Sequence, residues 1–171
     1  ASGDTRPALP PGTLCCETGS VFDVKEFVSA CVHANAETEP RRAVRELLDR
    51  ALATPGGVAD TMAPTEAGFT LLHHTPELTV LHIVWAPGMV LYPHDHRMWA
   101  VIGIYAGRED NAFFRRNGTA LTESGGKELQ TGDSVILGDN TIHSVANPTD
   151  RLNTEDQIVP ERQQQEEDQA P

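Results

Sequence analysis

Apolar residues recur at two spacings along this chain, and the spacing changes near residue 68. Between residues 21 and 57 they return every three or four positions, which predicts two amphipathic helices. We expect Pro40 to open the second helix and the Pro-Gly-Gly run that begins at Pro55 to end it. The apolar stripes that should hold the helices against a common layer are Val21, Val24, Phe27, Val28 and Cys31, and Val44, Leu47, Leu48 and Leu52.

From residue 68 onward, short runs rich in β-branched and apolar residues replace the helical pattern. Gly, Pro, Asn or Asp separates these runs, and no internal repeat of fixed period is present. Many short strands at regular spacing predict a sandwich or a barrel instead of a parallel α/β sheet. The expected strands lie in GFTLLHHT, ELTVLHIVWAPG, WAVIGIYAG, DNAFFRR, ALTES, KELQTGDSVILG and IHSVANP.

The two ends of the chain differ in composition from its middle. Residues 1–20 are rich in Pro and Gly and are expected to be loose. Residues 151–171 carry six acids against two arginines and no aromatic residue, which predicts a disordered acidic tail. One domain is therefore expected over residues 21–150, with a helical layer at 21–57 and a barrel at 68–150.

Charge and cysteine content exclude several classes of partner. The 171 residues have a net charge of −12, which argues against binding to nucleic acid or to an anionic membrane. No run approaches the roughly 18 apolar residues of a membrane span. The three cysteines, Cys15, Cys16 and Cys31, are an odd number and include an adjacent pair, so we expect reduced thiols and a cytoplasmic protein.

The stretch YPHDHRMWAVIG contains two histidines that share one side of a predicted strand, His94 and His96. The same side continues with apolar residues as far as Ile104, so it should face the barrel interior, whereas Trp99 should face the helices. Interior imidazoles without partners are costly, and a divalent metal ion would bind their neutral nitrogens. The alternative is hydrogen-bonded core histidines without metal, which is the role that we expect for His82.

Two spaced motifs extend this pattern. They consist of Gly88, His94, His96 and Gly107, and of Gly132, Gly138, His143 and Asn147. Over about residues 85–148 they resemble the two-part signature of the cupin superfamily. The resemblance implies a mainly β fold, a cupin double-stranded β-helix or jelly-roll barrel, here with an N-terminal pair of helices.

The cupin resemblance also implies a metal centre held by His94, His96 and His143. The usual cupin has a glutamate ligand at the position of Ala100, and alanine cannot bind a metal. A site of three neutral imidazoles leaves the full charge on a divalent ion and should favour anionic ligands such as a thiolate, an enolate or a carboxylate.

Within the cupins, the chain most resembles the cysteine-dioxygenase-like group of thiol dioxygenases. The resemblance lies in the HDH triplet that follows Trp85 and Gly88, in the missing glutamate, and in HSVANPTDR around His143. It implies Fe(II) as cofactor and a small thiol and O2 as substrates, with a sulfinate as product. Arg115 and Arg116 point to opposite faces, so one could enter the barrel mouth, and we take Arg116 and Trp85 as the candidate catalytic residues.

The chain departs from that group in three places. The arginine that clamps the substrate carboxylate is absent from AGFTLLHHTPEL, so discrimination in favour of a carboxylate should be weak. The cysteine that forms a thioether falls at or next to Ala100. The late serine-histidine-tyrosine strand should follow Asn147, where the acidic segment lies, so the final barrel strand has no good candidate.

A missing strand would leave one barrel edge unpaired. Another segment of the chain, or a second copy of the chain in a homo-oligomer, would then have to close the barrel. Otherwise the chain would be a shortened form whose barrel stays open. Two alternatives to a thiol dioxygenase therefore stay open. One is a metal-binding cupin without turnover, and the other is a different cupin enzyme such as an isomerase or a dioxygenase of an enol.

Overall fold

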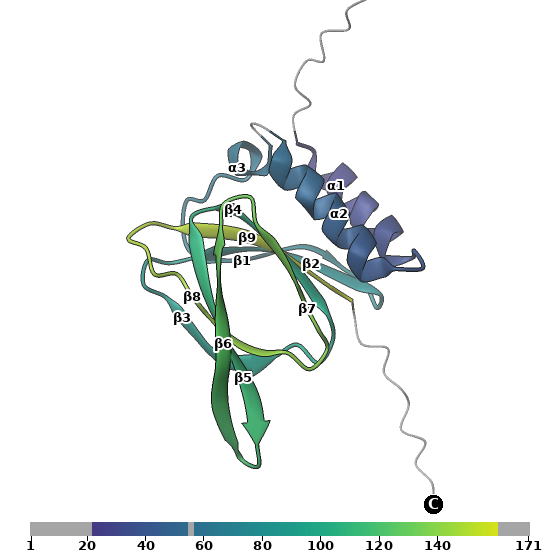
Figure 1. Cartoon of the computed structure of the whole chain (residues 1–171). Helices are drawn as coiled ribbons and strands as arrows, with labels where there is room; N and C mark the ends of the chain where they lie inside the picture. The colour runs from purple at the N-terminus through teal and green to yellow at the C-terminus, as the bar shows by residue number, and fades with distance from the viewer. Residues whose placement is uncertain (1–21, 55–56, 161–171) are drawn as a thin grey trace, which may run out of the picture.

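The computed structural model describes residues 22–54 and 57–160, which form three helices and nine strands (Figure 1). The predictions for residues 1–20 and for residues 161–171 lie outside the described residues. The helices are α1 (Val24–Asn35), α2 (Pro40–Ala53) and α3 (Val58–Thr61). The strands are β1 (Gly68–His74), β2 (Leu78–Trp85), β3 (Val90–Asp95), β4 (Ala100–Ala106), β5 (Arg108–Asn117), β6 (Ala120–Gln130), β7 (Ser134–Leu137), β8 (Ile142–Ala146) and β9 (Asn153–Pro160).

Two antiparallel sheets face each other and form the barrel. The larger sheet has the strand order β1-β2-β9-β4-β7, and the smaller sheet has the order β3-β8-β5-β6. Strands that are distant in sequence, such as β2 and β9, are neighbours, whereas β5 and β6 form a hairpin that projects past the barrel (Figure 1). This arrangement is the double-stranded β-helix predicted from the sequence, and the mainly β fold class is confirmed.

The helices α1 and α2 begin at residues suited to that position and lie side by side outside the larger sheet (Figure 1). Asp23 caps α1, because its carboxylate accepts hydrogen bonds from the backbone N–H groups of Lys25 and Glu26 at 2.8 and 3.0 Å. Pro40 is the first residue of α2, as predicted, since its fixed φ suits that position and the missing N–H would have no partner there.

The helices pack onto β4 at very short range. A Cβ atom added at Gly103 would lie 2.6 Å from Cδ2 of Leu48, so only glycine leaves room for this contact. Leu48 and Val44 are fully buried, and each contributes roughly 1.5–3 kcal/mol through the apolar surface that it removes from water. Trp99 belongs to the same core, which confirms that it faces the helices.

The segment after Asn147 contradicts the prediction of a disordered tail from residue 151. Residues 153–160 form β9, which lies between β2 and β4 in the middle of the larger sheet. Its backbone pairs with β2 from Leu78–Pro160 to Trp85–Asn153, and with β4 on its other side. The final barrel strand is therefore present, and the missing strand that led us to consider a homo-oligomer or a shortened form is found within the described residues.

Strand β9 was not predicted from the sequence because of its polar composition. Six consecutive residues, 153–158, are buried in the barrel, and the first five of them are polar. Polar side chains are buried at acceptable cost only where partners meet them, and those partners come from distant strands. Asp156, for example, lies 2.8 Å from Nδ1 of His82 and accepts a hydrogen bond from the Tyr105 hydroxyl at 2.6 Å. His82 is thus the buried, hydrogen-bonded core residue that was expected.

Candidate metal centre

The three predicted histidines converge on one point inside the barrel. His94 of β3 and His143 of β8 are directly opposite each other in an antiparallel pair, so their side chains share a face. His96 follows β3 and has the same parity as His94. One ring nitrogen from each histidine lies within 4.8 Å of the other two, and the described part of the chain contains no second group of this kind.

The spacing of these nitrogens fits a metal ion. Nε2 of His96 lies 3.1 Å from Nε2 of His143. Two imidazole nitrogens on adjacent corners of an octahedron, each about 2.1 Å from the ion, would be about 3.0 Å apart. Three nitrogens on one face would leave positions for other ligands, as the donor set of a catalytic centre requires. Ala100 is buried and supplies no ligand, so the centre has three histidines, as predicted.

The protonation of the rings suits the same role. Burial, and after it the neighbouring His94 ring, lowers the pKa of His96 to about 4. Burial and the two other rings lower the pKa of His143 to about 3. Both imidazoles are therefore neutral at physiological pH, which is the form that binds a metal.

Hydrogen bonds made by Nδ1 orient two of the rings and leave Nε2 of each ring available to a metal ion. Nδ1–H of His94 donates to the backbone carbonyl of Tyr92 at 2.9 Å. Nδ1–H of His143 donates to Oδ1 of Asn111 at 2.8 Å, and the Asn111 amide in turn donates to Oε1 of Glu109 at 2.7 Å. Such contacts select the tautomer and hold the ring in place for the metal. Sequence reasoning did not identify Asn111 or Glu109.

A cavity of about 230 Å³ adjoins the three histidines. Most of its wall is apolar, and none of the described residues that line it is a lysine or an arginine. Its lining residues are Phe69, Leu81, Ile83, Trp85, Leu91, His94, His96, Ile102, His143, Val145, Glu155, Gln157 and Val159. A space of this size and character suits a small molecule of few atoms with a largely uncharged body.

The structure separates the two candidate catalytic residues. Trp85 is 3% exposed, lines the cavity and packs edge-on against Phe69 at a ring distance of 5.8 Å. Arg116 is exposed on the projecting β5–β6 hairpin and is not among the residues that line the cavity. Its parity is also opposite to that of Phe113, which pairs with His143, so the choice of Arg116 for the cavity is not supported by its position.

Strand β9 supplies the cavity residues that sequence reasoning missed. Glu155, Gln157 and Val159 face the histidines from the larger sheet. The side-chain amide nitrogen of Gln157 lies 3.1 Å from Nδ1 of His96. None of the three is a serine, histidine or tyrosine, so the strand is present but lacks the side chains of the group that the chain resembles. Alternation along a strand would have shown their common face had β9 been recognised.

Comparisons with known proteins agree with the fold. No protein-family model matches the chain, and no curated protein matches it. It is similar to BH2720 from Bacillus halodurans, with 17% identity, a TM-score of 0.54 and coverage of 62% of this chain and 79% of that one. It is also similar to an RmlC-like cupin family protein with a double-stranded beta-helix fold from Methanocaldococcus jannaschii, with 13% identity, a TM-score of 0.49 and coverage of 58% and 84%.

A cupin superfamily protein from Desulfitobacterium hafniense DCB-2 is a third similar structure, with 13% identity, a TM-score of 0.47 and coverage of 57% of this chain and 80% of that one. At these identities the likeness concerns the fold alone. The resemblance to cysteine-dioxygenase-like enzymes stays a prediction. Among the described residues, no helix has the length and apolar character needed to span a membrane.

Proposed function

We propose that this protein is a metal-dependent dioxygenase that oxidises a small thiol to a sulfinate, with Fe(II) as the metal. The observation that carries the proposal is the cluster of three histidines beside a small, largely apolar cavity, with no carboxylate among the possible metal ligands. Such a centre keeps its full positive charge and therefore favours an anionic sulfur ligand. The sequence motifs around the three histidines resemble those of thiol dioxygenases.

Iron bound by His94, His96 and His143 would supply a partner for O2 and would stabilise the thiolate. The overall reaction is balanced, because a thiol and one O2 give a sulfinate and one proton. The role of the chain is to hold the rings and to exclude water. Asn111 keeps the His143 ring oriented, and the rings of Trp85 and Phe69 line the cavity.

A cupin without turnover was the main alternative, and it drew its support from the missing barrel strand. Because β9 completes the larger sheet, that support is gone. The cavity beside the histidines instead favours a protein that binds a small molecule next to its metal.

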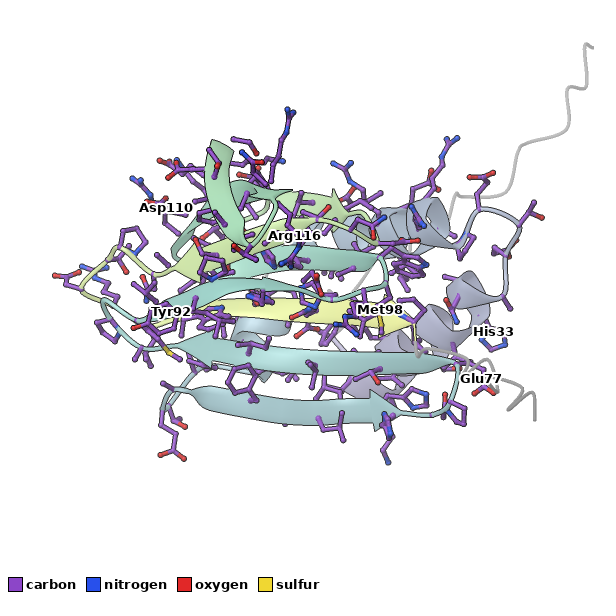
Figure 2. The ribbon with its side chains drawn as sticks, turned by 90° about the horizontal axis from the view of Figure 1, so that it is seen from below. His33, Glu77, Tyr92, Met98, Asp110 and Arg116 are labelled. Carbon is purple, nitrogen blue, oxygen red and sulfur yellow. The ribbon has the colours of Figure 1, made fainter. Side chains whose placement is uncertain are left out.

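The proposal is tested by loading the purified protein with Fe(II) without oxygen and then measuring O2 uptake with a panel of thiols. The expected result is uptake that matches sulfinate formation, with both sulfinate oxygens labelled when 18O2 is used. His143→Ala should abolish the reaction. His33→Ala is a matched control, because His33 is an exposed histidine on α1 and belongs to no part of the site (Figure 2). Metal-loaded protein that consumes no O2 above the level of His143→Ala with any thiol would contradict the proposal.

A further inference from the structure

The cavity contains one acidic group that the metal centre does not use. Glu155 is 1% exposed and lines the cavity wall, yet its Oε2 atom has no hydrogen-bond partner among the described residues. Its carboxylate is not part of the cluster of possible ligands formed by the histidines. Apart from those histidines, it is the only ionisable side chain among the described residues that line the cavity.

A second buried carboxyl group lies behind it. Glu109 of β5 is fully buried, is near enough to Glu155 for the two carboxyl groups to interact, and also has an oxygen without a hydrogen-bond partner. Burial raises the pKa of Glu155 well above its usual range, and the Glu109 carboxyl raises it further. Two carboxyl groups this close can share one proton, which leaves a single negative charge on the pair.

No described cation balances that charge. Neither glutamate forms a salt bridge with a described lysine, arginine or histidine, although arginines elsewhere in the barrel pair with acids, such as Arg108 with Asp110. A buried charge without a partner is costly, and proteins keep one mainly where a ligand completes it. The indole N–H of Trp85 faces the same carboxyl and is also without a hydrogen-bond partner of normal geometry.

We propose that Glu155, supported by Glu109, forms an ammonium-binding subsite of the cavity, so that the protein selects a small primary amine that bears the reacting group. This inference rests on the proposed function, and in that setting the substrate class is an aminothiol without a carboxylate. The ammonium group binds Glu155 while sulfur lies at the three histidines. The rings of Phe69 and Trp85, which line the same cavity, also suit a cation.

The same charge disfavours the opposite class of ligand. A carboxylate in the cavity would meet Glu155 and would find no lysine or arginine among the lining residues. The absence of the early-strand arginine therefore does more than remove a preference for a carboxylate. Together with Glu155 it predicts the order ammonium, then neutral, then anionic for thiols of equal length.

The test measures binding to Co(II)-loaded protein without O2, through the absorption of the thiolate–metal complex. The probes are 2-aminoethanethiol, 2-mercaptoethanol and 3-mercaptopropionate. We expect the ammonium probe to bind at least about tenfold more tightly than the neutral one, since a hydrogen bond to a buried charge is worth that much. In Glu155→Gln the two affinities should fall within about threefold of each other, while Glu123→Gln, an exposed glutamate on β6, should behave as wild type.

Glu109→Gln separates the two acids, because it keeps the carboxylate that faces the cavity and should keep the preference. Equal binding of the ammonium and neutral probes by wild type, or an unchanged ratio in Glu155→Gln, would overturn the inference. Weaker metal binding in Glu155→Gln with an unchanged ratio would also overturn it, because the carboxylate would then serve only to balance the metal.

The outcome for this subsite is independent of oxygenation. A binding preference without O2 uptake by the Fe(II) protein would refute the proposed reaction and leave the subsite standing. Oxygenation of all three thiols, together with equal binding affinities, would support the proposed reaction and refute the subsite. Should no thiol bind the metal, NMR titration of the Zn(II) protein with ethylammonium and with ethanol decides: shifts of cavity residues by ethylammonium that Glu155→Gln removes support the subsite, and their absence refutes it.

Discussion

Strand β9 carries two buried acids on its opposite faces, and their surroundings differ. Asp156 faces the helices, where the His82 ring and the Tyr105 hydroxyl occupy its two oxygens. Glu155 faces the cavity, where one of its oxygens has no hydrogen-bond partner and the carboxyl group of Glu109 interacts with it. Two carboxyl groups that are equally buried can therefore have different roles. A carboxylate whose partners are all present stabilises the fold, whereas one without them is available to a ligand.

The largest effect should come from removing the acid on the helix-facing side of β9, whose hydrogen-bond partners are all present. Asp156→Ala leaves His82 and the Tyr105 hydroxyl buried without a partner, so we expect a loss of about 3 kcal/mol in the free energy of unfolding. The melting temperature should fall by roughly 6–12 °C. Folded protein should still bind Co(II), because the metal centre lies on the other face. A change of less than about 2 °C would show that the Asp156 contacts are not structural.

Next in size is a change behind the metal on the cavity face. Asn111→Ala removes the acceptor for Nδ1–H of His143, so the affinity for Zn(II) should fall by about 10–100-fold, measured by competition with a chelator. Asn117→Ala provides the control, since Asn117 is exposed at the end of the same strand. Wild-type affinity in Asn111→Ala would mean that the ring is oriented without this hydrogen bond.

Glu155→Gln should have a smaller effect on stability, and of opposite sign to Asp156→Ala. Burial and Glu109 raise the pKa of Glu155 above its ordinary value of 4.5. Above that pH the folded state holds a proton that the unfolded state has lost, so wild-type stability decreases as the pH rises. The glutamine variant lacks this dependence and should gain about 1 kcal/mol near neutral pH.

Thermal unfolding from about pH 5 to about pH 8 measures this difference, which should grow with pH. At the acidic end wild type and variant should melt at nearly the same temperature. A gain that is constant across the range, or a loss of stability at neutral pH, would mean that the Glu155 charge is already balanced in the folded protein.

The smallest effect is expected from changing a residue that lies on neither face of β9. Arg116→Ala changes an exposed residue of the projecting hairpin, so stability should change by less than about 0.5 kcal/mol. The relative affinities for ammonium, neutral and anionic thiols should be those of wild type. A selective loss of binding by 3-mercaptopropionate would show that Arg116 reaches the cavity, as the sequence predicts.

Much of the fold and the metal centre could be predicted because the signals are local. Alternation places His94 and His96 on one face, and the resemblance of the motif from Gly132 to Asn147 to the cupin signature identifies His143 as the third candidate ligand. The same alternation directs Trp99 to the helices, and the stripe of α2 directs Leu48 to β4. These conclusions need only the geometry of a single strand or helix, which a short stretch of sequence contains.

The acids and amides of the cavity could not be predicted in this way. The segment from Asn153 to Gln157 contains only polar residues, and a strand of that composition is stable only if other strands supply its partners. The local sequence likewise does not distinguish Glu109 and Asn111 from other polar strand residues. Their roles depend on Glu155 and His143, which lie beside them only in the folded barrel.

The sequence by itself determined the helical pair, most of the strands and the three histidines that could hold a metal. Only the tertiary structure decided that the barrel is complete, that Arg116 lies outside the cavity, and that Glu155 lies inside it. The reason is physical: the direction of a side chain follows from its own backbone, whereas the cost of burying a charge depends on which groups from distant segments surround it.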